Sequence, residues 1–519
     1  MNGAHALLST LHTNHVTTCF ANPGTSEMHF VAGLDEVPEI RGILCLFEGV
    51  ATGAADGFAR VSGTPAATLL HLGPGLGNGW ANLHNARRAR VPLVNIVGDH
   101  ATYHAQYDAP LQSDIAALAG ALNGWQRRTL HPNDVARDAA DAIAAAYGPP
   151  GRIATLILPA DTSWGEVTAP SPWPVAVRAE TPTFDAAAFA RALHLLRQNE
   201  HPVALYLGSD AVNEAGLALA SRLAHATGAR VFMETFPPIM DRGAGIAAPE
   251  RLIYLSEFAI AQLRDVKALL MIGATEPVGF FAYPDVASRL VSDDCELVAV
   301  APPGTDTAGA LAALVDELRA PDLVVARGAR PSAPSGGLST QSVAAAVGAT
   351  LPEGLIVADE SNTSGVHMFA ATQFAPAHQW MTLTGGAIGY GLPVAVGAAV
   401  ASGRRVLALE SDGSMMYTLQ ALWTMARENL DVTVLALSNR SYAILNLERQ
   451  RVGAVGDGAA SQHMLEIDDP TLDLCALATA QGVPSTRVST AEELVIALQI
   501  SYATPGPMFI EAVLPKGLG

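Results

Sequence analysis

The 519-residue sequence is poor in charged residues, above all in basic ones, and in cysteine. Only 15% of its residues are charged and 50% are hydrophobic, so we expect packed interiors and subunit interfaces rather than disordered segments. Lys and Arg number 30 against 49 Asp and Glu, a formal net charge of −19. Because this charge repels phosphodiester backbones and anionic lipids, we expect neither a nucleic-acid nor a membrane partner.

The cysteines form no CxxC pair, which argues against a thiolate zinc site and a disulfide framework. They lie far apart, at Cys19, Cys45, Cys295 and Cys475. The N-terminus lacks the basic start and apolar run that export requires. Both observations predict a cytoplasmic protein with reduced thiols. The uncharged stretch 385–403 could span a membrane by length, but its glycines and Pro393 favour close helix packing instead.

Length and patterning predict three α/β domains. At roughly 150 residues per domain, the chain holds about three. Short β-branched runs alternate with helical patterns, which is typical of parallel sheets covered by helices. Two Pro-rich stretches, 167–182 and 330–337, have the composition of linkers. We therefore predict three doubly wound parallel-sheet domains, at 1–165, 185–325 and 340–519.

The segment 404–442 reads as one strand–helix–strand unit. Its first strand, Val406–Leu409, runs into Asp412, and its second, Val432–Leu437, runs into Asn439. In a right-handed crossover both side chains emerge at the carboxyl edge of the sheet, where open α/β folds bind ligands. One carboxylate and one amide oxygen can then share a Mg²⁺ ion with phosphate oxygens and water. The competing interpretation is an ordinary Asp-Gly turn followed by a loop-capping Asn.

This segment resembles the thiamin diphosphate binding motif, an Asp-Gly-Ser followed some two dozen residues later by Asn. The resemblance implies that Asp412, Asn439 and the backbone carbonyl of Ser441 hold Mg²⁺, and that Gly413 and Ser414 adjoin the diphosphate. One residue departs from the pattern: the family usually has Gly where this chain has Ser411.

A glutamate in the first domain matches the same family. The pattern predicts a strand over Ile43–Phe47 and a helix from Glu48 towards Arg60. A carboxylate at a helix start often only compensates the helix dipole, worth ~0.3–1 kcal/mol. The flanking residues offer no cation, so a buried Glu48 needs a hydrogen-bond partner. The resemblance implies that this partner is the aminopyrimidine ring of the cofactor, which Glu48 protonates on the way to the nucleophilic ylide.

Two loops resemble those of benzoylformate decarboxylase and the acetolactate synthases. They are Phe20–Glu27 and Leu70–Asn78. In benzoylformate decarboxylase a serine and a histidine in these loops contact the substrate, which by position implies Thr25 or Ser26, and His71. A strand-end histidine could equally bond a backbone carbonyl.

Further positions carry over from the resemblance. The stretch Gly385–Pro393 matches the segment whose bulky residue, here Ile388, supports the bent cofactor, with Gly386 beside it. A helix follows the loop that carries Asn439 and Ser441. The resemblance implies that Ile444, Leu445 and Glu448 of this helix line the substrate pocket.

Other groups of the relatives are missing. The stretch 277–283 lacks the middle-domain histidine of benzoylformate decarboxylase, and Tyr107-Asp108 replaces the paired histidines of pyruvate decarboxylase. His100 and His104 could enter the cleft or simply stabilise their loop. The middle domain binds flavin in acetolactate synthases, but Gly208-Ser209-Asp210 lacks the spaced glycines of a dinucleotide fingerprint. FAD therefore has no support in the sequence.

These resemblances imply a thiamin diphosphate- and Mg²⁺-dependent enzyme acting on a small 2-oxo acid. We expect a non-oxidative decarboxylase with carboligase capacity. The alternative is an acetolactate synthase-like carboligase, and a third hypothesis is a catalytically silent cofactor-binding protein. Since the family holds the two ends of the cofactor on different subunits, a homodimer is the expected minimum and a homotetramer the expected assembly.

Overall fold

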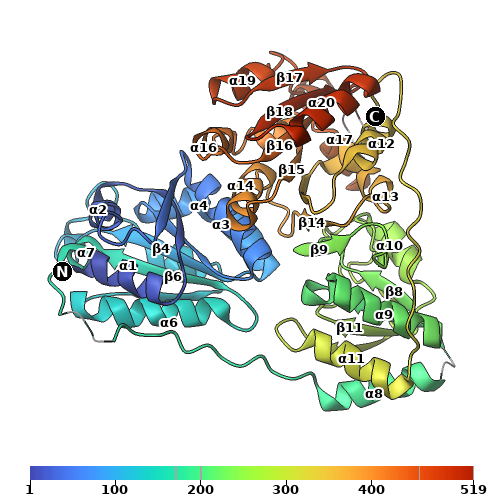
Figure 1. The fold of residues 1–519 in the computed structure, drawn as a ribbon, viewed down its shortest axis with the longest axis horizontal. Coiled ribbons are helices and arrows are strands. Elements are labelled where there is room, and N and C mark those ends of the chain that lie inside the picture. Colours follow the sequence, from blue (N-terminus) through green and yellow to red (C-terminus); the bar gives the residue numbers. More distant parts are fainter. Residues whose placement is uncertain (169, 171, 199–200, 455, 457, 518–519) are drawn as a thin grey trace.

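The computed structural model describes residues 1–168, 170, 172–198, 201–454, 456 and 458–517. Three separate sheets follow one another along the chain, each covered by helices (Figure 1). All strands of the first two sheets pair in parallel. The prediction of an α/β protein with three doubly wound parallel sheets is confirmed, and the third sheet carries one antiparallel edge strand in addition.

The first sheet has the strand order β2-β1-β3-β4-β6-β5. Its strands are β1 (Thr18–Asn22), β2 (Arg41–Leu44), β3 (Ala66–Leu70), β4 (Leu93–Asp99), β5 (Trp125–Arg128) and β6 (Ile153–Pro159). The helices are α1 (Gly3–Thr13), α2 (Met28–Gly33), α3 (Glu48–Ser62), α4 (Leu72–Ala89), α5 (Ile115–Gly120), α6 (Val135–Tyr147) and α7 (Ala160–Trp164). Helices α1 and α6 share one core with the sheet, and α3 and α4 share another.

One strand boundary of the first sheet differs from the prediction. The strand expected over Ile43–Phe47 is β2, which ends at Leu44. After one more backbone bond, from Cys45 N–H to Ala21 O at 2.8 Å, the chain turns away from the sheet. Phe47 then caps α3 in an extended conformation, with φ −157°. The helix begins at Glu48, as predicted.

The second sheet has the order β10-β8-β7-β11-β12. Its strands are β7 (Val203–Leu207), β8 (Arg230–Met233), β10 (Glu250–Arg251), β11 (Ala268–Ile272) and β12 (Glu296–Ala301). Its helices are α8 (Ala186–Gln198), α9 (Glu214–Thr227), α10 (Ser256–Leu263) and α11 (Thr307–Leu318). The described parts of the connections from this sheet to the other two run along the outside of the molecule (Figure 1).

The third sheet has the order β17-β18-β16-β15-β13-β14-β9. Its strands from the C-terminal segment are β13 (Ile356–Glu360), β14 (His378–Thr382), β15 (Val406–Ser411), β16 (Val432–Ser438), β17 (Ser485–Val488) and β18 (Met508–Val513). The helices are α12 (Thr340–Thr350), α13 (Met368–Ala371), α14 (Gly391–Ser402), α15 (Asp412–Met415), α16 (Ala421–Arg427), α17 (Ala443–Arg451), α18 (Ala459–His463), α19 (Leu474–Ala480) and α20 (Ala491–Ala503).

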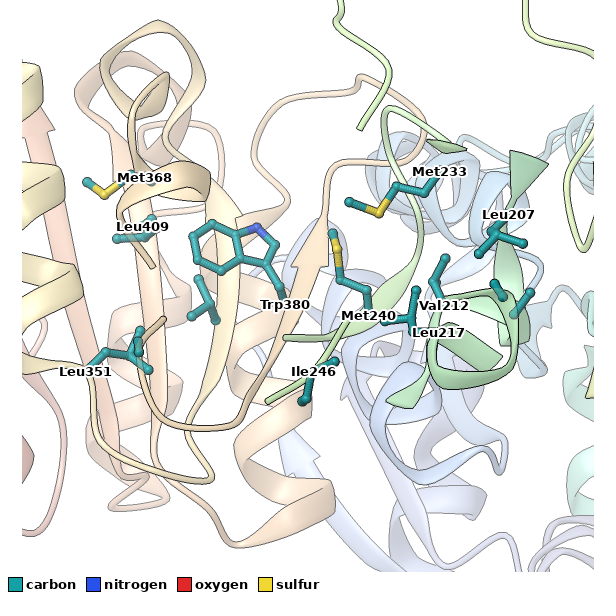
Figure 2. Packing of buried hydrophobic residues seen from close by; sticks show 14 of the residues in the cluster. Leu207, Val212, Leu217, Met233, Met240, Ile246, Leu351, Met368, Trp380 and Leu409 are labelled. Atoms are coloured by element: carbon teal, nitrogen blue, oxygen red, sulfur yellow. The ribbon is translucent and has the colours of Figure 1, made fainter. Parts of the chain in front are cut away.

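The edge strand β9 (Ile239–Arg242) comes from the middle of the chain and pairs antiparallel with β14. Met240 lies opposite Trp380 in this pairing. Figure 2 shows Met240 and Met233 of the middle segment facing Trp380 and Leu409 of the third sheet, and all four belong to one continuous buried cluster. The second and third sheets therefore share a hydrophobic core, an arrangement that linker composition alone did not predict.

Helices α3 and α14 pack closely across the first and third sheets. A Cβ at Gly57 would collide with the carbonyl of Val394, and one at Gly397 would collide with the carbonyl of Ala54. The stretch 385–403 therefore packs as the sequence predicted, with glycine allowing backbone to approach backbone. Among the described residues, no helix is long and apolar enough to cross a membrane.

Candidate functional site

Glu48 lies at the start of α3, beyond the carboxyl end of β2. It is only 7% exposed. One of its oxygens accepts a hydrogen bond from Asn78 Nδ2 of α4 at 3.0 Å. The other lies near Gly75, where an added Cβ would stand 3.1 Å from Glu48 Oε1. The carboxyl group is thus held in one orientation at the mouth of the first sheet, with Asn78 as the partner that the sequence reasoning did not identify.

His71 caps α4 directly after β3 and bonds an acidic partner. Its Nδ1 lies 2.8 Å from Glu27 Oε2, and the same oxygen accepts from the Gly24 N–H at 2.7 Å. Thr25 and Ser26 occupy the short 3₁₀ turn Thr25–Glu27 that presents Glu27. The structure therefore brings Thr25, Ser26 and His71 together through a buried carboxyl group.

Glu27 is 2% exposed, and its Oε1 has no hydrogen-bond partner among the described residues. Burial raises the pKa of Glu27, while the Gly24 N–H and His71 oppose that rise. Gly98 at the end of β4 makes room for the carboxyl group, because a Cβ there would collide with Oε1. With Nδ1 of His71 committed to Glu27, only its Nε2 remains to meet a ligand.

His100 lies on the same sheet edge, since β3 and β4 are neighbours. Its ring stands 5.3 Å from that of His104, which stands 5.8 Å from Tyr107. Burial lowers the pKa of His100, and the nearby His104 and His71 add to this effect. Its Nε2 is buried without a partner among the described residues. The ring contacts with His104 support the loop interpretation, and the proximity to His71 supports the cleft interpretation.

Asp412 begins the short helix α15 at the carboxyl end of β15. Its carboxylate is 3% exposed and accepts N–H bonds from Gly413 at 2.8 Å and from Arg440 at 2.5 Å. Burial raises the pKa of Asp412, although these N–H groups oppose that rise. The predicted meeting of the two strand ends is therefore present, with Asp412 bonded to the residue directly after Asn439.

The neighbouring polar groups are also fixed. Asn439 Oδ1 accepts from the Ser441 N–H at 3.2 Å, and its Nδ2 donates to Gly517 O at 3.1 Å. Ser414 Oγ accepts from Asn362 Nδ2 at 2.8 Å. A Cβ at Gly413 would stand 2.6 Å from the Tyr442 ring, so glycine keeps the backbone clear there.

This donor set fits a hard divalent cation beside a diphosphate. Asp412, Asn439 and the Ser441 carbonyl offer only oxygen atoms, which Mg²⁺ prefers. The described residues contain no group of three or more His, Cys, Asp or Glu that could hold a metal by themselves. Phosphate oxygens and water would therefore have to complete the shell.

The loop before α14 is held by a glutamate that the sequence reasoning missed. Glu360, at the end of β13, accepts three successive N–H bonds, from Gly389 at 2.8 Å, Tyr390 at 2.9 Å and Gly391 at 2.7 Å. Its only sequence signal was an acid at a strand end. The half-buried Ile388 and the exposed Gly386 lie in this loop.

A second carboxyl group lies beside Glu360. Glu410 of β15 is paired in register with Glu360 and is fully buried. Burial and the adjacent Glu360 raise the pKa of Glu410 well above its usual range. Burial likewise raises the pKa of Glu360 to about 7. Glu410 therefore holds its proton more tightly than an exposed glutamate does.

The side chain of Asn82 on α4 joins the two halves of the chain. Its Nδ2 donates to Gly49 O at 2.9 Å and to Gly389 O at 3.1 Å. The first turn after Glu48 is thus tied to the loop that carries Ile388. Nearby, Asn85 Nδ2 donates to Ala387 O at 2.8 Å.

The predicted pocket residues lie on α17. Ile444 is half-buried and Leu445 is exposed. Glu448 lies 3.1 Å from Arg451 and accepts a long bond from Tyr254 OH at 3.4 Å. The carboxylate of Glu448 therefore already interacts with Arg451 of its own helix and with Tyr254 of the middle segment.

Comparison with protein families gives two matches. The N-terminal TPP binding domain of the thiamine pyrophosphate enzymes matches residues 1–120, and their C-terminal TPP binding domain matches residues 363–512. Thiamine pyrophosphate is another name for thiamin diphosphate.

Individual proteins are similar over nearly the whole chain. A Mycobacterium tuberculosis protein with the provisional name acetolactate synthase large subunit IlvX is 56% identical, covering 100% of both chains. Benzoylformate decarboxylase of Pseudomonas aeruginosa is 31% identical, covering 96% of both. The solved structure of a thiamine diphosphate-dependent 4-hydroxybenzoylformate decarboxylase from Rhodococcus jostii superposes with a TM-score of 0.85 at 24% identity, covering 100% of both chains. That last likeness concerns the fold.

Proposed function

Since this chain belongs to the thiamine pyrophosphate enzyme family, we propose that it uses thiamin diphosphate and Mg²⁺ to decarboxylate a 2-oxo acid non-oxidatively, with carboligase capacity. When bound, the cofactor supplies a nucleophilic carbon and an electron sink for the departing carbon dioxide. The observation that carries the proposal is that two carboxyl groups are already oriented at the carboxyl edges of two sheets. Glu48, at the edge of the first sheet (the N-terminal edge), is oriented by Asn78, and Asp412, at the edge of the third sheet (the C-terminal edge), is oriented by the Arg440 N–H.

The C-terminal edge is proposed to hold Mg²⁺ and the diphosphate. Asp412, Asn439 and the Ser441 carbonyl would be the metal ligands, with Gly413 and Ser414 beside the phosphates. The bonds that Asp412 accepts from backbone N–H groups fix its carboxylate before any ligand arrives, which lowers the cost of binding. Ile388 would support the two rings of the cofactor, and Gly386 would adjoin them.

The N-terminal edge is proposed to handle protons and the substrate's carboxylate. Glu48 would donate a proton to the aminopyrimidine ring. Glu27 would hold His71 with Nε2 towards the substrate, beside the hydroxyl groups of Thr25 and Ser26. Ile444, Leu445 and Glu448 would border the substrate from the other edge.

An acetolactate synthase-like carboligase is the second candidate. The 56% identical relative with that provisional name favours it. So does the stretch 277–283, which offers no histidine to deliver a proton to the product. His71 favours the decarboxylase. The retained Glu48, Asp412 and Asn439 speak against a silent cofactor-binding protein, and flavin has no supporting fingerprint.

We also propose that the enzyme works in the cytoplasm as a homodimer or a homotetramer. A dimer would bring Glu48 of one subunit to Asp412 of the other, as the family arrangement implies. All four cysteines are free in the structure, which agrees with a reducing compartment.

Product analysis separates the two reactions. Purified protein with thiamin diphosphate and Mg²⁺ is incubated with a panel of 2-oxo acids, and the products are identified by mass spectrometry. Carbon dioxide with one aldehyde per acid consumed supports the decarboxylase. A hydroxyketone assembled from two acids supports the carboligase. If no 2-oxo acid is consumed although cofactor binds, the proposed function is wrong.

A further inference from the structure

Five aromatic side chains of the middle segment gather next to the proposed cofactor loop. Phe280 is their centre: its ring lies 5.8 Å from Phe236, 5.4 Å from Tyr254 and 5.0 Å from Phe281. Tyr283 follows three residues later on the same loop. Such offset and edge-to-face rings make a stiff apolar surface.

This cluster borders both elements of the proposed site in the third sheet. A Cβ at Gly386 would collide with the tip of the Phe280 ring, so that ring lies against the loop that carries Ile388. On the other side, Tyr254 OH bonds Glu448 Oε1 of α17 at 3.4 Å. Phe280 therefore stands between the cofactor loop and the helix proposed to line the substrate pocket.

The members of the cluster differ in exposure. Tyr283 is 8% exposed, whereas Phe280 is 41% and Phe281 54% exposed. Tyr283 attaches the loop 277–283 to α17, because Arg451 of that helix lies 3.7 Å above the Tyr283 ring. The exposed face of Phe280 is not needed for this attachment. Leu445 on α17 is also 44% exposed.

The two arginines next to the aromatic cluster already have partners within the protein. Arg451 lies 2.6 Å from Glu257 and 3.1 Å from Glu448, so it is committed to two carboxylates. Arg251 packs behind Phe236, 5.6 Å from its ring centre, and its Nε donates to Thr235 O at 2.6 Å. A second carboxylate or a hydroxyl group on a substrate would lose water here, and both Arg451 and Arg251 already have other partners.

We propose that Phe280 is a specificity-determining residue whose exposed face contacts the side chain of the substrate and selects 2-oxo acids with an apolar side chain. This inference rests on the proposed function, because that function places the rings of the cofactor on Ile388 with Gly386 beside them.

The test compares substrates in the parent and in Phe280→Ala. We measure kcat/KM for pyruvate, 4-methyl-2-oxopentanoate, benzoylformate and 2-oxoglutarate. The expected result is that the parent prefers apolar side chains over 2-oxoglutarate, and that Phe280→Ala lowers kcat/KM for the two larger apolar acids roughly tenfold relative to pyruvate. Phe280→Leu should restore the preference for the branched acid. Val278→Ala, an exposed apolar change on the same loop, is the matched control and should leave the ratios unchanged.

Binding gives an independent readout. An acylphosphonate analogue of benzoylformate cannot lose carbon dioxide, and it should raise the unfolding temperature of the parent with bound cofactor more than that of Phe280→Ala. Unchanged substrate ratios and unchanged stabilisation by the analogue would overturn the proposal. A different mass of the assembled oligomer in Phe280→Ala would also overturn the proposal, because the Phe280 ring would then belong to a subunit interface. If the parent consumes no 2-oxo acid at all, the proposed function fails first.

Discussion

Asn78 Nδ2 donates a hydrogen bond to Glu48 Oε2 at 3.0 Å, from one helix to the first residue of another. Asn78 itself is exposed, whereas Glu48 is buried. The bond therefore orients the proposed acid without contributing to the hydrophobic core, and its effect on catalysis can be separated from its effect on folding.

Replacement of Asn78 by Ala should slow turnover while leaving stability nearly unchanged. A hydrogen bond to a charged or proton-donating carboxyl is worth about 1.5–3 kcal/mol, so we expect kcat to fall roughly 10- to 100-fold. Steady-state kinetics at saturating cofactor and urea unfolding give the two quantities. Asn78→Ser, which retains a donor, should fall between parent and Ala variant. A stability loss as large as the catalytic loss would assign Asn78 a structural role.

Glu27 and His71 should behave as one unit. Glu27→Gln keeps a hydrogen-bond acceptor for His71 Nδ1 but removes its charge, and we expect kcat to fall by about tenfold or more with an altered pH profile. The double variant Glu27→Gln/His71→Asn should be little worse than His71→Asn alone, because groups that act together are not additive. Additive losses would contradict a working pair.

Asp412→Ala should weaken binding of thiamin diphosphate in the presence of Mg²⁺. Loss of a metal ligand should cost at least the roughly 10- to 100-fold seen for outer-shell partners, and titration calorimetry measures it. Chelation with EDTA should weaken binding to the parent in the same way. Asp431→Asn is the control, because Asp431 is a half-buried acid directly before β16 that pairs with Arg405. Equal affinities in Asp412→Ala and Asp431→Asn would exclude the proposed metal site.

Glu234 should make stability depend on pH. It follows β8, against Gly208, where a Cβ would stand 2.6 Å from its Cδ. Burial raises the pKa of Glu234 to about 7, from an unfolded value of 4.5. The folded state therefore binds more protons between these values, and the free energy of unfolding falls as pH rises through this window, by up to about 1.4 kcal/mol per pH unit.

The Glu234→Gln variant removes this contribution, because its amide does not titrate. Denaturant unfolding of parent and variant from pH 4 to 8 should give curves that converge or cross as pH falls and separate in favour of the variant as pH rises towards 8. Parallel curves over the whole range would mean that the carboxyl of Glu234 keeps an ordinary pKa in the folded protein.

The alternation of apolar strands and helices was enough to predict three parallel sheets and the strand ends that carry Asp412 and Asn439. Parallel strands place their carboxyl ends at one edge whatever the detailed packing. The helix beginning at Glu48 was also predictable, because its apolar periodicity starts there.

Long-range contacts were not predictable in the same way. The strand β9 joins the third sheet through pairing of Met240 with Trp380, residues far apart in sequence. Asn78, Glu27 and Glu360 act through partners that only the folded chain brings near, and their local sequence does not show what they bond. A polar side chain at a strand end is a weak signal until its partner is known.

The measurement that bears most directly on the account is exchange of the thiazolium proton of bound thiamin diphosphate with deuterium, compared between the parent and Glu48→Gln by quenched-flow NMR. We expect Glu48→Gln still to bind the cofactor but to exchange this proton roughly 100-fold more slowly or worse. Equal exchange rates at equal occupancy would contradict the role assigned to Glu48 and with it the proposed enzyme mechanism.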